Sequence, residues 1–244
     1  MKYFVKNTFL GFLICVCAVP NYLKAQSLTE QSDLGNWLIY IGSKKLNQNW
    51  NWHHEVQYRN YSNNIEDLEQ LLLRTGLGYT FSNKNQNLLL GYAYILFPGY
   101  TLDVRNERGE ILEPSYKIID FEHRVFQQFI LKQRINHLKL SHRFRFEQRQ
   151  FASQFKMRFR YFLSARLPFK NVNENKFYFS WYNELFLGYT FDQQLYSGFF
   201  DRNRLYGGLG YEISEGINLE LGYLNQFFGS SSRDQLNLIM FLNL

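Results

Sequence analysis

The chain has 244 residues, a formal net charge of +6, a mean hydropathy of −0.36 and 19% aromatic residues. Beyond the N-terminal segment it holds no apolar run near the roughly 20 residues that a membrane-spanning helix needs, so a bundle of such helices is excluded. The composition leaves a β-rich protein, either soluble or embedded in a membrane with its polar side chains turned inward.

The first residues have the pattern of an export signal. Lys2 and Lys6 precede an apolar run over residues 9–19, and the small residue Ala25 stands before Gln26. The run is too short to span a bilayer as a helix. We predict a cleaved signal peptide over residues 1–25 and a single mature domain over residues 26–244.

Cleavage would change both the charge and the chemistry of the chain. Removing Lys2, Lys6 and Lys24 takes the formal charge from +6 to +3. The remaining positive charge is weak evidence for nucleic-acid binding, and we predict no nucleic-acid partner. Both cysteines, Cys15 and Cys17, lie in the leader. The mature chain is therefore predicted to lack disulfides and thiolate metal sites.

The mature chain alternates with period two, which is typical of strands with unlike faces. Over residues 50–59 two tryptophans, His54, Val56 and Tyr58 share one face, and polar residues fill the other. The same split recurs over residues 138–149, 157–167 and 236–244.

The tripeptide Leu-Gly-Tyr occurs five times, with glycine at residues 78, 91, 188, 210 and 222. In each copy Leu and Tyr fall on the apolar face and Gly on the polar face. One copy indicates no more than chance or a bulge. Five copies in the same phase favour a regular feature of the sheet.

We expect eleven strands, most of them 10–14 residues long. They lie near residues 35–43, 49–60, 68–81, 87–97, 119–132, 137–149, 155–168, 177–189, 202–213, 217–227 and 234–244. Tilted membrane strands need about 9–11 residues, whereas strands of soluble sheets average about 5–6. The links also alternate, short near 82–86, 135–136 and 214–216 and longer at 98–118 and 190–201.

These features predict an all-β protein that forms a single closed antiparallel transmembrane β-barrel. Because bacterial single-chain barrels normally have an even strand number, we expect about twelve strands (10–12). The missing strand would lie near 26–34 or 98–118, unless the N-terminal segment threads the lumen. The alternative is a soluble barrel or sandwich. It would place Leu140, Phe144 and Phe146 in a dry interior.

In the membrane interpretation, charged residues of the polar face line the lumen. The candidates are Arg59, Arg74, Arg124, Arg143, Arg145, Arg149, Arg158, Arg160, Arg202, Arg204, Glu55, Glu69, Glu122, Glu147, Glu184 and Glu220. The simpler interpretation is that they neutralise one another as a lumen-filling network. The alternative is an arginine-lined track that favours small anionic solutes.

Catalysis is not predicted. The candidates for a Ser-His-acid site are the histidines 53, 54, 123, 137 and 142, with Ser141 and either Asp120 or Glu122. Ser141 and His142 are neighbours on a strand and point to opposite faces, as do Glu122 and His123, so the groups cannot converge. The adjacent histidines 53 and 54 diverge in the same way. We predict no cofactor and no metal.

Several stretches resemble the family called domain of unknown function 2490. They are residues 34–37, 55–61, 122–124, 155–161, 182–184 and 201–211, which together span most of the mature chain. The resemblance implies an exported outer-membrane protein. The family has no assigned activity, so it transfers no functional residue.

The sequence thus predicts a non-enzymatic barrel in the outer membrane of a Gram-negative bacterium, with outer-membrane lipid as its partner. Its function would be that of a small pore with an arginine-rich lumen favouring anionic solutes, or of a structural barrel. The alternative is a barrel enzyme that acts on envelope lipids.

Overall fold

The computed structural model describes residues 34–62, 67–100, 104–105, 111–113, 117–169, 176–190 and 199–244. The predicted signal peptide lies outside the described residues, and so does a strand near 26–34 or an N-terminal segment in the lumen. The described residues form an all-β structure with thirteen strands. In chain order the strands are β1 (Gly35–Lys45), β2 (Trp50–Asn60), β3 (Leu68–Thr80), β4 (Gln86–Tyr100), β5 (Val104–Arg105), β6 (Ile111–Glu113), β7 (Lys117–Ile135), β8 (Leu138–Gln150), β9 (Phe155–Pro168), β10 (Phe177–Thr190), β11 (Phe200–Ser214), β12 (Ile217–Phe227) and β13 (Ser232–Asn243).

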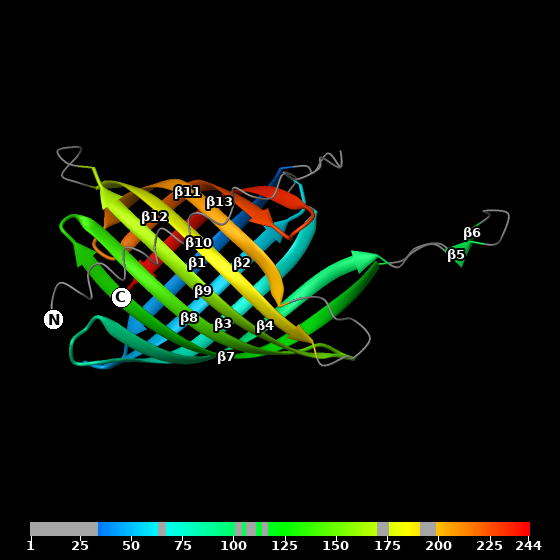
Figure 1. Cartoon of the computed structure of the whole chain (residues 1–244), viewed down its shortest axis with the longest axis horizontal. Coiled ribbons are helices and arrows are strands. Elements are labelled where there is room, and N and C mark those ends of the chain that lie inside the picture. Colours follow the sequence, from blue (N-terminus) through cyan, green and yellow to red (C-terminus); the bar gives the residue numbers. More distant parts are fainter. Residues whose placement is uncertain are drawn as a thin grey trace. The chain divides into compact units, whose positions relative to one another are not determined.

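Eleven of these strands close into one barrel, in the order β1-β13-β12-β11-β10-β9-β8-β7-β4-β3-β2 (Figure 1). Strands consecutive in this order pair antiparallel, with one exception. At the seam β1 pairs β13 in parallel, from Gly35 opposite Gln235 to Ser43 opposite Asn243. The short strands β5 and β6 pair only with each other.

The expected closed all-β barrel is confirmed, and its eleven strands match the eleven expected segments and fall in the expected range of 10–12. The expected even number and the expected purely antiparallel pairing are wrong. An up-and-down chain reverses direction at every link, so its first and eleventh strands run the same way. An odd barrel must therefore close through one parallel pair. The described residues of 98–118 supply no twelfth barrel strand, because β4 and β7 take the ends of this region and β5–β6 form a separate sheet.

The two ends of the barrel carry different links. Because strand direction alternates, the links 81–85, 136–137 and 215–216 lie at one end with the C-terminal end of β13. We call this the turn end. The links 101–116 and 191–199 lie at the other end, the loop end. Left-handed backbone at Asn136 and Gly216, with φ of 55° and 83°, makes two of the tight turns.

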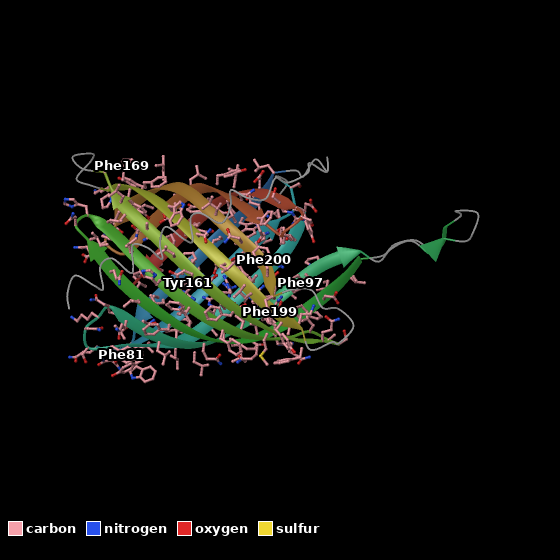
Figure 2. All side chains as sticks on the ribbon, viewed as in Figure 1. Phe81, Phe97, Tyr161, Phe169, Phe199 and Phe200 are labelled. Carbon is pink, nitrogen blue, oxygen red and sulfur yellow. The ribbon has the colours of Figure 1, made fainter. Side chains whose placement is uncertain are left out.

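The barrel wall is apolar outside and largely charged inside. Leu221 is 62% exposed and Phe144 and Phe146 are each 38% exposed, whereas the intervening Arg145 and the next inward residue Glu147 are 2% and 0% exposed. Most side chains that project beyond the outline of the wall are carbon-rich (Figure 2). Phe144 and Phe146 do not lie in a dry interior, as a soluble barrel would require.

The Leu-Gly-Tyr repeats have a steric explanation in this wall. Their leucines and tyrosines lie on the outer face, and their glycines lie inside. A Cβ at Gly91 would overlap the ring of Phe126, and one at Gly222 would overlap the ring of Tyr206. At these two positions glycine therefore leaves room for an inward aromatic side chain from a neighbouring strand.

Candidate functional site: the charged interior

The candidate lumen residues converge inside the barrel, where twelve of the sixteen are buried. Ion pairs link most of these charged side chains to one another.

The remaining four are of intermediate exposure, and each pairs with an interior group. They are Arg143, Arg149, Arg202 and Glu69.

Glu147 of β8 is the centre of this network and is fully buried. Its carboxylate accepts hydrogen bonds from Arg158 Nη2 and Arg160 Nη1, each at 2.7 Å. Arg124 Nη1 lies 3.4 Å from the same carboxylate, and Arg145 Nη1 lies 3.7 Å from it. One buried carboxylate is thus shared by four guanidinium groups, which suits the several donors of arginine.

Two further carboxylates extend the network along the wall. Glu122 of β7 accepts hydrogen bonds from Arg149, at 2.7 and 2.9 Å, and from Arg124. Glu184 of β10 accepts from Arg160 and Arg143 at 2.6 and 2.7 Å. Since Arg124 and Arg160 also contact Glu147, the three carboxylates form one connected cluster.

The other candidate acids make smaller groups. Glu55 pairs with Arg74 and lies 3.3 Å from His53. Glu220 accepts a hydrogen bond from the Tyr178 hydroxyl at 2.9 Å and pairs with Arg166, while Glu69 pairs with Arg233 at 3.0 Å.

Inward aromatic rings support the arginines. The guanidinium carbon of Arg160 lies 4.5 Å from the ring centre of Phe186, and that of Arg204 lies 4.7 Å from it. Arg145 stacks on Phe126 at 4.6 Å. These contacts are favourable where water is excluded, so the rings help to hold buried cations that have few carboxylate partners.

Several interior residues are absent from the sequence-based candidates. Arg166 has the phase of Arg158 and Arg160 and was detectable from the alternation. Arg233 precedes the expected start of its strand. Asp201, which pairs with Arg158 at 3.2 Å, follows a register shift between β10 and β11 that no local pattern indicates.

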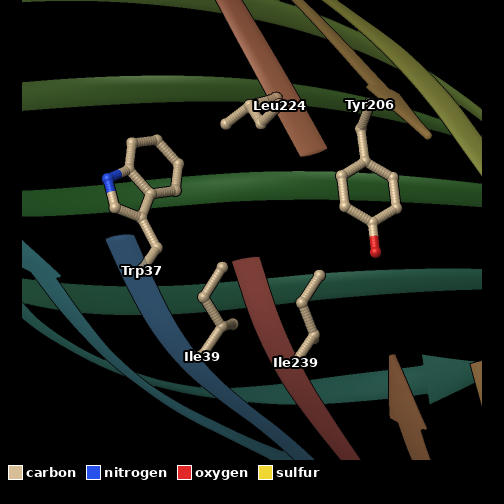
Figure 3. Packing of buried hydrophobic residues seen from close by; sticks show 5 residues of the cluster. All are labelled: Trp37, Ile39, Tyr206, Leu224 and Ile239. Carbon is tan, nitrogen blue, oxygen red and sulfur yellow. The ribbon is translucent and has the colours of Figure 1, made fainter. Parts of the chain in front are cut away.

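The interior also contains apolar clusters, which the sequence analysis did not predict. One cluster joins Trp37, Ile39, Tyr206, Leu224 and Ile239, all buried, and lies beside the seam (Figure 3). A second joins Leu72, Leu89, Ala93, Ile95 and Phe126. The signal was present as runs such as residues 37–41 and 88–96, which are apolar on both faces of the strand.

Among the described residues, Ser141 and His142 do not converge. His142 has the outward phase of Phe144, and its Nδ1 is 2.9 Å from the Tyr161 hydroxyl, whereas Ser141 has the inward phase of Arg143. His123 Nδ1 is 2.6 Å from the Tyr92 hydroxyl, also on the outer face. These pairs place imidazole beside phenol, an arrangement that lacks the carboxylate that would orient a catalytic base.

The outer face carries one hollow of about 480 Å³ near the loop ends of β8, β9 and β10. Its lining is mostly apolar, with Phe146, Met157 and Leu187, and also includes Arg158 and Tyr189. A lining of this kind offers mainly contact surface.

Within the described residues, no helix is long and apolar enough to cross a membrane. No group of three or more His, Cys, Asp or Glu side chains within the same residues has the arrangement of a metal site.

The chain is similar to an uncharacterized protein of Methylorubrum extorquens, with 31% identity over 193 residues, or 78% of this chain and 77% of the relative. The model of a family described as a protein of unknown function, DUF2490, matches residues 34–237. That match covers nearly all of the barrel and agrees with the resemblance seen in the sequence. The chain therefore belongs to the DUF2490 family.

Proposed function

We propose that this protein is a non-enzymatic β-barrel of the outer membrane of a Gram-negative bacterium, exported by the signal peptide over residues 1–25. Its interior is held closed by ion pairs, so its primary role is that of a structural membrane barrel. The observation that carries the proposal is the sidedness of the wall, with leucines and aromatic rings outside and arginine–glutamate pairs inside.

The physical argument starts from the outer face. A water-soluble barrel would expose the side chains of Leu90, Leu209 and Leu221, each more than half exposed, to solvent. Contiguous apolar surface of this extent is unfavourable in water but suits acyl chains. Closure of the sheet pairs the backbone groups that lipid cannot satisfy.

The burial of the charged interior side chains favours a closed barrel rather than an open channel. Glu122 and Glu147 are fully buried, and Arg145 is 2% exposed, so side chains fill the wall-to-wall space around them. A water-filled channel would leave these charged groups accessible to solvent.

Passage of small anions is a second candidate function, favoured by the excess of arginine. Among the twelve buried candidates are seven arginines and five glutamates. A rearrangement that opened the network would expose a cationic path that attracts anions.

The test uses the refolded chain in lipid vesicles and planar bilayers. We expect stable insertion and no sustained conductance. Anion-selective conductance, shown by reversal potentials in a salt gradient, would favour the second candidate. Failure to enter vesicles would contradict the membrane proposal, and cleavage of labelled envelope lipid would contradict the non-enzymatic one.

A further inference from the structure

Beside the seam, four buried side chains have polar atoms without a hydrogen-bond partner among the described residues. They are Trp37 Nε1, the Tyr206 hydroxyl and both amide atoms of Gln235 and Asn237. All four side chains are at most 2% exposed. A buried polar group without a partner is unfavourable, so these atoms point to a missing partner.

These residues lie together in the sheet. Trp37 of β1 is directly opposite Asn237 of β13, and Gln235 is two residues away on the same inward face. Gln235 is opposite Leu224 of β12, which is in turn opposite Tyr206 of β11. The unpaired atoms thus gather around the apolar cluster of Figure 3.

Two arginines stack on the same indole. The guanidinium carbon of Arg59 lies 3.9 Å from the Trp37 ring centre, and that of Arg204 lies 4.9 Å from it. Both cations therefore contact the ring of one buried indole.

Neither arginine has a carboxylate within hydrogen-bond distance among the described residues. Arg59 donates to the side-chain oxygens of Gln57 and Gln70, both at 2.9 Å, and these are neutral. Arg204 donates to the neutral Gln226 at 2.7 Å and has Glu184 only at 3.8 Å. Two buried cations without a close counter-charge are unfavourable.

We propose that Trp37, Arg59, Arg204, Tyr206, Gln235 and Asn237 form a binding site, the seam site, for a small oxyanion. The ligand is a carboxylate or phosphate group, whose oxygens accept from guanidinium, indole, amide and hydroxyl donors. The charge of such a group balances the two arginines, and its several lone pairs match the unpaired donors. This site goes beyond the proposed membrane role and does not require the barrel to conduct ions.

The test follows the indole resonances of the chain, refolded in detergent with ¹⁵N-labelled tryptophan. The chain has four tryptophans, and Trp37→Phe identifies the signal of the seam site. Inorganic phosphate or acetate, added at constant ionic strength, should shift the Trp37 signal saturably and leave the other three unchanged. Equal shifts of all four signals, the same response to chloride, or no response would overturn the proposal.

Variants assign the binding to the arginines. Arg59→Gln and Arg204→Gln should each weaken phosphate binding by about ten-fold or more, because each removes a charged donor. Arg233→Gln is the matched control, since Arg233 pairs with Glu69 at the loop end and should leave binding unchanged. Equal loss in all three would contradict a local site.

A second measurement covers the case in which a variant does not fold. Phosphate at constant ionic strength should raise the unfolding temperature of the unmodified chain, because a ligand that binds the folded state stabilises it. An unfolding temperature independent of phosphate would overturn the proposal without any variant.

Discussion

Two pairs of neighbouring strands enclose the same interior with different side chains. One pair is β8 with β9, and the other is β1 with β13. The inward face of the first pair carries Arg145, Glu147, Arg158 and Arg160, which belong to one network of ion pairs. The inward face of the second pair carries Trp37, Ile39 and Ile239 with unpaired amides between them. The difference teaches that this barrel is filled in two ways, by linked ion pairs on one wall and by packing on the other.

The largest expected effect tests the charged wall. Glu147→Gln should lower the free energy of unfolding by about 3–5 kcal/mol, because it leaves buried guanidinium groups without their shared carboxylate. Urea unfolding in lipid vesicles measures it. Glu215→Gln, at an exposed turn, is the control and should have almost no effect. A similar small effect for both variants would contradict the central place of Glu147.

The seam itself can be tested by cross-linking. Leu38 and Leu238 are in register across the parallel pair. In a chain without the leader cysteines, Leu38→Cys with Leu238→Cys should form a disulfide and stabilise the barrel by about 2–4 kcal/mol. Gel mobility with and without reductant detects the bond. Preferential linkage of Leu38→Cys to a cysteine at residue 236 would contradict this register.

Packing beside the seam predicts an intermediate effect. Gly208→Ala should cost about 1–3 kcal/mol, because the new methyl group meets the Tyr206 ring and the Leu221 carbonyl oxygen. Gly207→Ala is a matched control, since the nearest atom there is Phe179 Cζ at 4.0 Å. Thermal unfolding of the two variants compares them. Equal stability would mean that Tyr206 moves aside freely.

The smallest effect is expected at the loop end. The ion pair of Arg233 and Glu69 is partly exposed, with 31% of the arginine side chain accessible. Arg233→Gln should change the free energy of unfolding by less than about 1 kcal/mol. A loss of stability as large as that of Glu147→Gln would contradict this, because ion pairs at the loop end and at the centre would then contribute alike.

The sequence predicted the charged wall better than the seam. In β2, β8 and β9 polar and apolar residues alternate, so the two faces could be assigned residue by residue. In β1 and β4 both faces are apolar over several residues, and alternation cannot tell inside from outside. Alternation indicated eleven strand segments, and only the rule of even strand numbers raised the expectation to twelve. The parallel closure escaped prediction because lateral pairing of the first and last strands leaves no local pattern.

The sequence indicated which kinds of residue lie inside the barrel but not which of them pair with one another. Alternation placed Glu147 and Arg158 on one face, but it could not indicate that four arginines share one carboxylate. Asp201 was missed because a register shift changed its phase, and Arg233 was missed because it lies just before the expected start of its strand. The seam site combines residues of β1, β2, β11 and β13, which only closure of the barrel brings together.

The sidedness of the wall is tested most directly by spin labels on β12 in a chain reconstituted in lipid vesicles. Leu221→Cys carries a label on the outer face, and Asn218→Cys carries one on the inner face. We predict that the outer label is accessible to oxygen and shielded from a water-soluble nickel complex. If the nickel complex reaches the label at residue 221 as easily as a label in water, the outer face does not meet lipid and the proposed sidedness is wrong.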